Sequence, residues 1–155
     1  MSKKRLIVGL SGGLLVLAIA GPAAAWGVGL SVHSAADEKL CIDAKHDGKG
    51  AGTVVQLHTC NNTEAQRWAV ARNTDNWGQI IGPGGLCLAD KPSSKSAYLY
   101  GCTFADGQLW KQENGRLTQK SSGKCLTVAN VATDEPLVLE TCANVPKEVW
   151  KFKQE

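Results

Sequence analysis

The chain has 155 residues, with 17 Lys and Arg against 14 Asp and Glu, and 43% of its residues are hydrophobic. This length suits a single domain. Nucleic-acid binding depends on clustered Lys and Arg, and because the sequence shows no basic stripe, it argues against a nucleic-acid partner.

The first 25 residues carry the pattern of a secretory signal peptide. A basic start at residues 3–5 precedes an apolar run over residues 6–19, and small residues lead up to Ala25. An uncleaved membrane anchor is the alternative, but the apolar run is shorter than the roughly 20 residues that a spanning helix needs. We therefore predict cleavage after Ala25, with residues 1–25 as the signal peptide.

Cleavage would leave a mature domain over residues 26–155, secreted and extracellular. Removing three basic side chains takes Lys plus Arg from 17 to 14, against 14 Asp plus Glu, so this domain is formally neutral. Neutrality argues against electrostatic attachment to anionic membranes, and we expect no membrane contact after cleavage.

The domain contains a unit that occurs three times, at about residues 27–73, 74–113 and 114–155. In each unit a cysteine in an apolar context precedes a second cysteine, and a tryptophan follows the second cysteine by eight residues. The cysteine-to-tryptophan segments recur after 42 and then 40 positions, a period typical of structural repeats.

The six cysteines predict three disulfides, because their number is even and the chain carries an export signal. Many pairings are possible, and the repeat favours one pair in each unit. The sequence has no C-x-x-C pair and its three histidines are scattered, so it does not favour zinc, and we expect no metal site. The favoured pairs are Cys41–Cys60, Cys87–Cys102 and Cys125–Cys142.

Short strand-like runs alternate with turn residues from residue 26 onward, and no window has a sustained helical period. The expected strands lie at residues 28–33, 53–59, 67–72, 78–81, 97–102, 109–112, 116–119, 125–128, 137–141 and 149–152. With a strand around each first cysteine, every unit holds four strands. Three units closed about a pseudo-threefold axis would hide their open edges and give an all-β domain.

Two of the cysteine pairs are followed by Gln66-Arg67-Trp68 and Gln108-Leu109-Trp110. These motifs resemble the Q-x-W signature of ricin-type (ricin B-like) β-trefoil lectin domains, a family similar to carbohydrate-binding modules. The third copy departs and reads Glu148-Val149-Trp150. The resemblance covers essentially the whole mature chain and implies a disulfide-stapled β-trefoil whose repeated tryptophans are structural. A tryptophan at a fixed strand position is also more often shared core than a ligand platform. The expected core tryptophans are Trp68, Trp110 and Trp150.

The resemblance further implies a shallow sugar pocket on each repeat. Such a pocket has an aspartate two residues after the first cysteine, an aromatic side chain on the second-cysteine strand, and nearby amides. A carboxylate accepts hydrogen bonds from sugar hydroxyls, an aromatic face packs on the apolar face of the ring, and an amide completes the bonding. The first repeat keeps most of this set, in Asp43, Gln56, His58 and Gln66.

Two points stay open for the first repeat. The family commonly has an asparagine just before the Q-x-W glutamine, where this chain has Ala65, and Asn61, Asn62 or Glu64 are the candidates to replace it. Asp43 has a second interpretation, as a turn acceptor for the glycine-rich loop that follows it.

The other two repeats keep less of the pocket. In the second repeat Tyr100 supplies the aromatic side chain, but Ala89 occupies the aspartate position. Asp90 follows one place later, on the opposite side of a regular strand unless a bulge turns it round. In the third repeat Thr127, Glu140 and Glu148 replace the expected residues, so we expect no sugar binding there.

Two functions compete. The leading hypothesis is a secreted lectin-like module that binds carbohydrate or a glycoconjugate weakly, without a cofactor, through one or two partly degenerate pockets. The alternative is a non-catalytic trefoil adaptor that binds another secreted protein in an extracellular assembly such as a toxin. Trp26 and Trp77 lie outside the repeated core positions and are candidates for such an interface, with ordinary packing as their alternative role.

We expect no enzyme. The sequence has neither a G-x-S-x-G elbow nor an H-E-x-x-H motif, and the disulfides leave no cysteine free as a nucleophile.

Overall fold

A computed structural model describes residues 27–73, 75–91 and 93–154 of the chain. The predicted signal peptide and Trp26 lie outside these residues. Within them, no helix has the length and apolar character needed to cross a membrane.

The described residues form twelve β-strands joined by loops and short 3₁₀ turns. The strands are β1 Gly27–Ser34, β2 Leu40–Ala44, β3 Val55–Thr59, β4 Trp68–Arg72, β5 Gly78–Ile81, β6 Cys87–Lys91, β7 Ser94–Tyr100, β8 Trp110–Glu113, β9 Arg116–Gln119, β10 Cys125–Val128, β11 Leu137–Glu140 and β12 Trp150–Gln154. The 3₁₀ turns are η1 Lys45–Asp47, η2 Glu64–Gln66, η3 Pro83–Gly85, η4 Asp106–Gln108 and η5 Pro146–Glu148.

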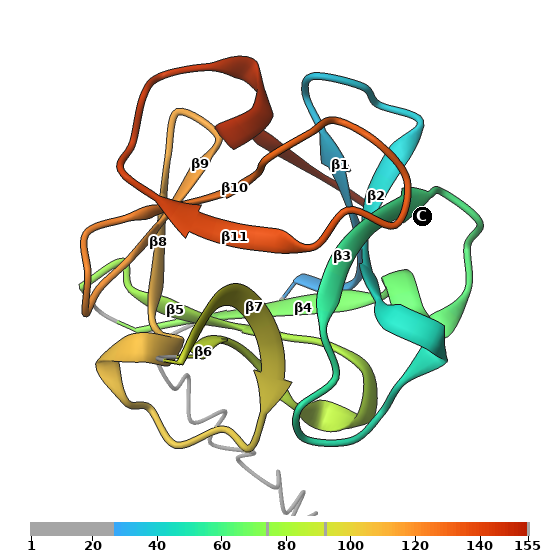
Figure 1. Cartoon of the computed structure of the whole chain (residues 1–155). Helices are drawn as coiled ribbons and strands as arrows, with labels where there is room; N and C mark the ends of the chain where they lie inside the picture. The colour runs from blue at the N-terminus through green and yellow to red at the C-terminus, as the bar shows by residue number, and fades with distance from the viewer. Residues whose placement is uncertain (1–26, 74, 92, 155) are drawn as a thin grey trace, which may run out of the picture.

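Six strands close into a barrel. β1 pairs with β12 and β4, β4 with β5, β5 with β8, and β8 with β9, all antiparallel. A bridge between Arg116 and Val149 links β9 to the start of β12. The remaining strands form the hairpins β2–β3, β6–β7 and β10–β11, which surround a common centre in Figure 1. This arrangement confirms the expected β-trefoil of three four-stranded repeats and covers the edges of the barrel strands.

The largest difference from the expected strands is in β7. Residues 97–102 were expected to be extended, whereas the strand spans Ser94–Tyr100. Its pairing with β6 begins at Lys91 and Ser94 and ends at Cys87 and Tyr100. The polar run that opens β7 has no apolar alternation to reveal it, because backbone pairing in the hairpin holds it extended.

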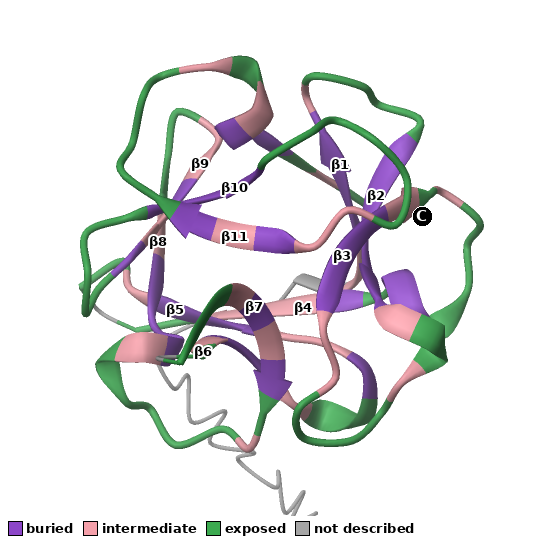
Figure 2. Ribbon diagram, viewed as in Figure 1, coloured by how far each residue is buried: buried purple, intermediate pink, exposed green. Residues whose placement is uncertain are grey.

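The same tryptophan contact occurs once in every repeat. The side chains of Trp68, Trp110 and Trp150 are no more than 3% exposed, within a core that Figure 2 shows along the inner parts of the strands. Each indole Nε1 donates a hydrogen bond of 3.0 Å to the backbone carbonyl of the residue that follows the first cysteine. The accepting residues are Ile42, Leu88 and Leu126. Each indole therefore holds the strand that it begins, β4, β8 or β12, against the first strand of the hairpin in its own repeat.

Three disulfides join the ends of the hairpins. Their sequence separations are 19, 15 and 17 residues. Closing loops of this size contributes about 3 kcal/mol each in the chain-entropy model. The bonds confirm the predicted pairing: Cys41–Cys60, Cys87–Cys102 and Cys125–Cys142.

An ion-pair network supports the junction between β1 and β12. Glu38, in the turn after β1, forms ion pairs with Lys151 and with Lys153, the latter at 2.8 Å. Hydrogen bonds from these two ammonium groups lower the pKa of Glu38 from 4.5 to about 2. The ionised carboxylate therefore stabilises the closed ring.

Truncation of a repeated tryptophan is expected to destabilise the fold. Trp110→Ala removes a buried indole and leaves the Leu88 carbonyl without its donor, so we expect a loss of about 3–5 kcal/mol in the free energy of unfolding. Denaturant unfolding measures this loss. Trp77→Ala, at a half-buried position, is the matched control and should cost clearly less; equal losses would contradict the core role of Trp110.

The Glu38 network predicts an acid-dependent contribution to stability. Because the folded pKa is depressed, the contribution is complete above about pH 4.5 and is lost as the pH falls toward about 2. Wild type should therefore be more stable than Glu38→Gln at neutral pH, by a margin that shrinks with acid and with salt. Urea unfolding across this pH range provides the measurement, with Glu140→Gln, at an exposed carboxylate, as control. A margin that stays constant down to pH 2 would be the contrary result.

Candidate functional site

A shallow pocket of about 170 Å³ lies on the first repeat, at the hairpin β2–β3. It combines three of the four residues predicted for this repeat with polar residues from the surrounding loops. Its lining consists of Asp43, His46, Asp47, Gln56, His58, Asn61 and Asp134.

Asp43 is held in place by two glutamine amides. It lies opposite Gln56 in the β2–β3 ladder, and Gln56 Nε2 donates to Asp43 Oδ1 at 3.1 Å. Gln66 Nε2 donates to Asp43 Oδ2 at 3.2 Å and to the Thr59 carbonyl at 3.0 Å. Gln66 is not part of the pocket lining, so its role is to orient the carboxylate from behind.

The environment of Asp43 changes its acidity. The residue is only 4% exposed, and burial raises the pKa of its carboxyl above the usual 3.8 although both glutamine amides act in the opposite direction. Further hydrogen-bond donors would therefore stabilise the ionised form of this buried carboxyl group.

Gln56 leaves one polar atom without a partner. Its amide orientation is set by the donation from Nε2 to Asp43, and its Oε1 atom is buried with no hydrogen-bond donor among the described residues. A buried acceptor that lacks a partner costs free energy. Because this oxygen is closed off from solvent, the role of Gln56 at the site is to orient the Asp43 carboxylate.

His58 forms the outer wall of the pocket and is held by the third repeat. Its Nδ1 lies 2.9 Å from Asp134 Oδ1 and 3.1 Å from Thr133 Oγ1. The His58 side chain is 36% exposed. The imidazole can therefore present a ring face to a ligand while its orientation is fixed by the loop before β11.

Sequence reasoning missed His46, Asp47 and Asp134, and it proposed Asn61 only as a possible replacement for the absent asparagine. His46 and Asp47 lie in η1 with left-handed backbone, at φ 58° and 52°. Asp134 lies in the third repeat, and nothing in the sequence of the first repeat predicts that it lines this pocket. The pocket thus depends on contacts between repeats, whereas the sequence motifs lie within single repeats.

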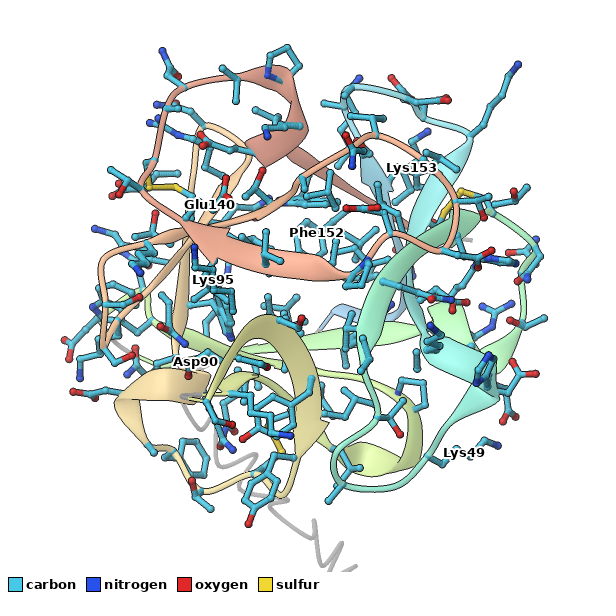
Figure 3. The ribbon with its side chains drawn as sticks, viewed as in Figure 1. Lys49, Asp90, Lys95, Glu140, Phe152 and Lys153 are labelled. Atoms are coloured by element: carbon cyan, nitrogen blue, oxygen red, sulfur yellow. A yellow bond between two sulfur atoms is a disulfide. The ribbon has the colours of Figure 1, made fainter. Side chains whose placement is uncertain are left out.

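In the second repeat the structure does not bring Asp90 and Tyr100 together. Asp90 pairs with Ala97, and Tyr98 and Tyr100 lie on the alternate face of the same hairpin, with ring centroids 5.8 Å apart. The register shift of this hairpin comes after Asp90. Asp90 instead lines a different pocket with Lys95, and Figure 3 places both residues well away from Lys49 of the first repeat.

The third repeat uses the same positions for internal contacts. Thr127 Oγ1 donates to the Lys147 carbonyl at 3.3 Å. The Glu148 carboxylate accepts from the backbone N–H groups of Ala143 and Asn144. Gln66 and Gln108 accept the equivalent bond through Oε1, from Asn61 and Thr103, at 2.8 Å each. A glutamate can accept this backbone hydrogen bond as a glutamine does, but it has no N–H group with which to orient a neighbouring carboxylate.

One cluster has the composition of a metal site. Among the described residues, only His33, Cys41 and Cys60 bring three potential ligand atoms within 4.8 Å of one another. The two sulfur atoms form a disulfide and are therefore not thiolate ligands. This cluster does not suit a metal ion.

Comparison with known proteins agrees with the fold. The described chain has a TM-score of 0.76 to a mosquitocidal holotoxin, at 16% identity, covering 86% of this chain and 17% of that one. To the C-terminal half of an earthworm R-type lectin, solved in complex with GalNAc, the TM-score is 0.69 at 11% identity, covering 83% and 100% of the two chains.

Sequence comparison gives a human relative and a family. Human polypeptide N-acetylgalactosaminyltransferase 15 is 28% identical over 122 residues, which are 74% of this chain and 18% of that protein. The chain thus spans about a fifth of the length of the curated relatives that it matches. The model of the ricin-type beta-trefoil lectin domain matches residues 76–155. With this match over more than half its length, the chain belongs to the ricin-type β-trefoil lectin domain family.

Proposed function

We propose that the protein is a secreted, non-catalytic lectin whose principal carbohydrate site is the pocket of the first repeat. The observation that carries the proposal is the Asp43 carboxylate, which two glutamine amides hold in one orientation at a pocket walled by His58. Two neighbouring hydroxyl groups of a sugar can donate further hydrogen bonds to this carboxylate.

The other pocket residues complete the recognition. Asp43 Oδ1 and Oδ2 each already accept one amide hydrogen bond, and a carboxylate oxygen has room for a second. The His58 ring offers a face to the apolar side of the sugar ring. Asn61 contributes its side-chain amide at the rim, where its Oδ1 already accepts from the backbone N–H of Thr63. The ligand is therefore a neutral saccharide with vicinal hydroxyls, bound by one carboxylate.

The shape of the pocket supports weak binding. The volume of about 170 Å³ is below the range of roughly 300–1,000 Å³ typical of enclosed ligand sites. His58 is a smaller stacking platform than a tryptophan or tyrosine. A single terminal sugar residue fits this description better than a long polysaccharide.

A second candidate function, as an adaptor for another secreted protein, is favoured by one observation. Trp77 is half-buried beside Phe104, which is 71% exposed, and together they form an apolar patch on the second repeat. Apolar patches with aromatic side chains mark interfaces. Trp26, the other predicted interface residue, stays a prediction.

Removal of the carboxylate tests the sugar site. Asp43→Ala should weaken binding of the recognised sugar roughly tenfold to hundredfold, since hydrogen bonds to a charged group are worth about 1.5–3 kcal/mol. Calorimetry with galactose, xylose and N-acetylglucosamine measures the effect, with Asp43→Asn as a variant of similar shape and thermal melting as a check of folding.

Thr127→Ala is the matched control, because Thr127 occupies the same position in the third repeat and makes only internal contacts. Binding should be unchanged in this variant. Full binding by folded Asp43→Ala protein would place the site elsewhere, and loss in Thr127→Ala would move it to the third repeat.

The raised pKa of Asp43 predicts acid-sensitive binding. The ionised carboxylate accepts the sugar hydroxyls, so affinity should fall as the pH falls through a pKa above 3.8. The effect on stability has the opposite sign: protonation of Asp43 favours the folded state, because the unfolded carboxyl has the lower pKa. Calorimetric titrations from neutral pH to pH 3 measure affinity, and His58→Gln separates any contribution of the imidazole. An affinity that persists below pH 3.8 would refute this dependence.

A further inference from the structure

The second repeat carries an apolar pocket that the sugar site does not use. Its volume is about 380 Å³, and its wall is formed by the ends of β4 and β5 together with the segment between β7 and β8. Most of its surface is apolar, from Trp77, Ile81, Leu109 and Phe104. An apolar cavity of about 150 Å³ is already enough to hold a benzene ring, so this pocket has room for an aromatic side chain.

The third repeat shows why the pocket is open. Arg116 in β9 is equivalent to Gln79 in β5, because each follows a glycine directly, Gly115 and Gly78 respectively. Arg116 Nη1 donates to Asn144 Oδ1 at 3.2 Å and so spans the corresponding space. Gln79 is shorter and only 3% exposed, and its Nε2 is buried without an acceptor among the described residues. The second repeat thus lacks the contact that closes this space in the third.

The second repeat also lacks an equivalent of Asn144, the residue that accepts the hydrogen bond from Arg116 in the third repeat. The second residue after the second cysteine is Asn62 in the first repeat, Phe104 in the second and Asn144 in the third. All three have left-handed backbone, with φ of 61°, 58° and 60°. Asparagine adopts this conformation readily, whereas a bulky aromatic residue there is an outlier. A strained position that presents a phenylalanine 71% exposed to solvent points to a function for this side chain.

The charged groups around the pocket are of both signs. Lys111 Nζ lies 6.0 Å from the Trp77 ring centroid and forms an ion pair with Glu113 at 2.6 Å. Arg72 lies in the wall and donates to Gln112 Oε1 at 3.1 Å, and the exposed Asp75 follows on the same loop as Trp77. A patch of one sign would repel a copy of itself, and this mixture of charges avoids that repulsion.

We propose that the occupant of this patch is a second copy of this chain and not a different protein. Two copies associate through the surface formed by Trp77, Gln79, Ile81, Phe104 and Leu109. The exposed ring and the open pocket lie side by side on one surface. A two-fold axis brings each patch onto the same patch of the other copy, so that Phe104 of each molecule enters the pocket of its partner. The burial of two phenylalanine rings stabilises the contact.

The proposal is independent of the sugar site but adds to its use. A dimer carries two first-repeat pockets, and two weak sites that engage one glycosylated surface bind with higher avidity than either site alone. If the first-repeat pocket binds no sugar, the dimer stands, because its contacts lie in the second repeat.

Sedimentation velocity of the purified protein over a wide concentration range tests the association. Wild type should show a reversible monomer–dimer equilibrium. Phe104→Asn should raise the dimer Kd at least about thirtyfold, and it should fold normally, because asparagine has the same backbone conformation in the other two repeats. Adding Gln79→Arg to this variant recreates the Arg116–Asn144 pair, fills the pocket and should leave only monomer.

Val131→Asn is the matched control, since Val131 is 40% exposed on the third repeat, outside the patch. It should leave the equilibrium unchanged. A wild-type protein that stays monomeric at every concentration would overturn the proposal, as would a dimer that Phe104→Asn leaves intact. Sugar binding by monomeric wild type that is lost in Phe104→Asn would also overturn it and would assign the patch to a ligand.

Discussion

The hydrogen bond from each repeated tryptophan to the carbonyl of the residue after the first cysteine is the constraint on which the rest of the structure depends. Trp68, Trp110 and Trp150 make it at the same length, and it ties a barrel strand to the hairpin of its own repeat. The indoles also supply the largest buried surfaces in the core. A disulfide closes the same hairpin in each repeat, so both the indole hydrogen bond and the disulfide hold the hairpin in place.

The proposed sugar site depends on this contact. Asp43 follows the Ile42 carbonyl that Trp68 binds, and Gln66 precedes Trp68 by two residues. When the indole is seated, the carboxylate and the amide that orients it are brought together at 3.2 Å. The indole-to-carbonyl contact is present in all three repeats. The residues at the aspartate position differ, and only the first repeat has a carboxylate there: Asp43, Ala89 and Thr127.

Much of the fold could be predicted because its determinants are local and repeated. The spacing of Cys60 and Trp68, found again in two further copies, predicted a threefold repeat with one cysteine pair in each unit. The resemblance of the Q-x-W motifs to ricin-type domains then implied the trefoil and its tryptophan core. The site was less accessible to prediction. Asp43 and Gln56 follow from hairpin pairing, but Asp134 reaches the pocket from another repeat. The open pocket beside Trp77 results from Gln79 and Phe104 together, and neither residue signals an unfilled volume by itself.

The hydrogen bond between His58 and Asp134 has a consequence for how such a protein diverges. Because a loop of the third repeat holds the wall of the first repeat's pocket, the proposed recognition surface belongs to the closed ring and not to a single repeat. Changes in the loop before β11 can therefore alter ligand preference while β2 and β3 keep their sequence. A first repeat transferred alone into another protein would keep the Asp43 carboxylate, but its His58 would lack the Asp134 contact that holds the pocket wall.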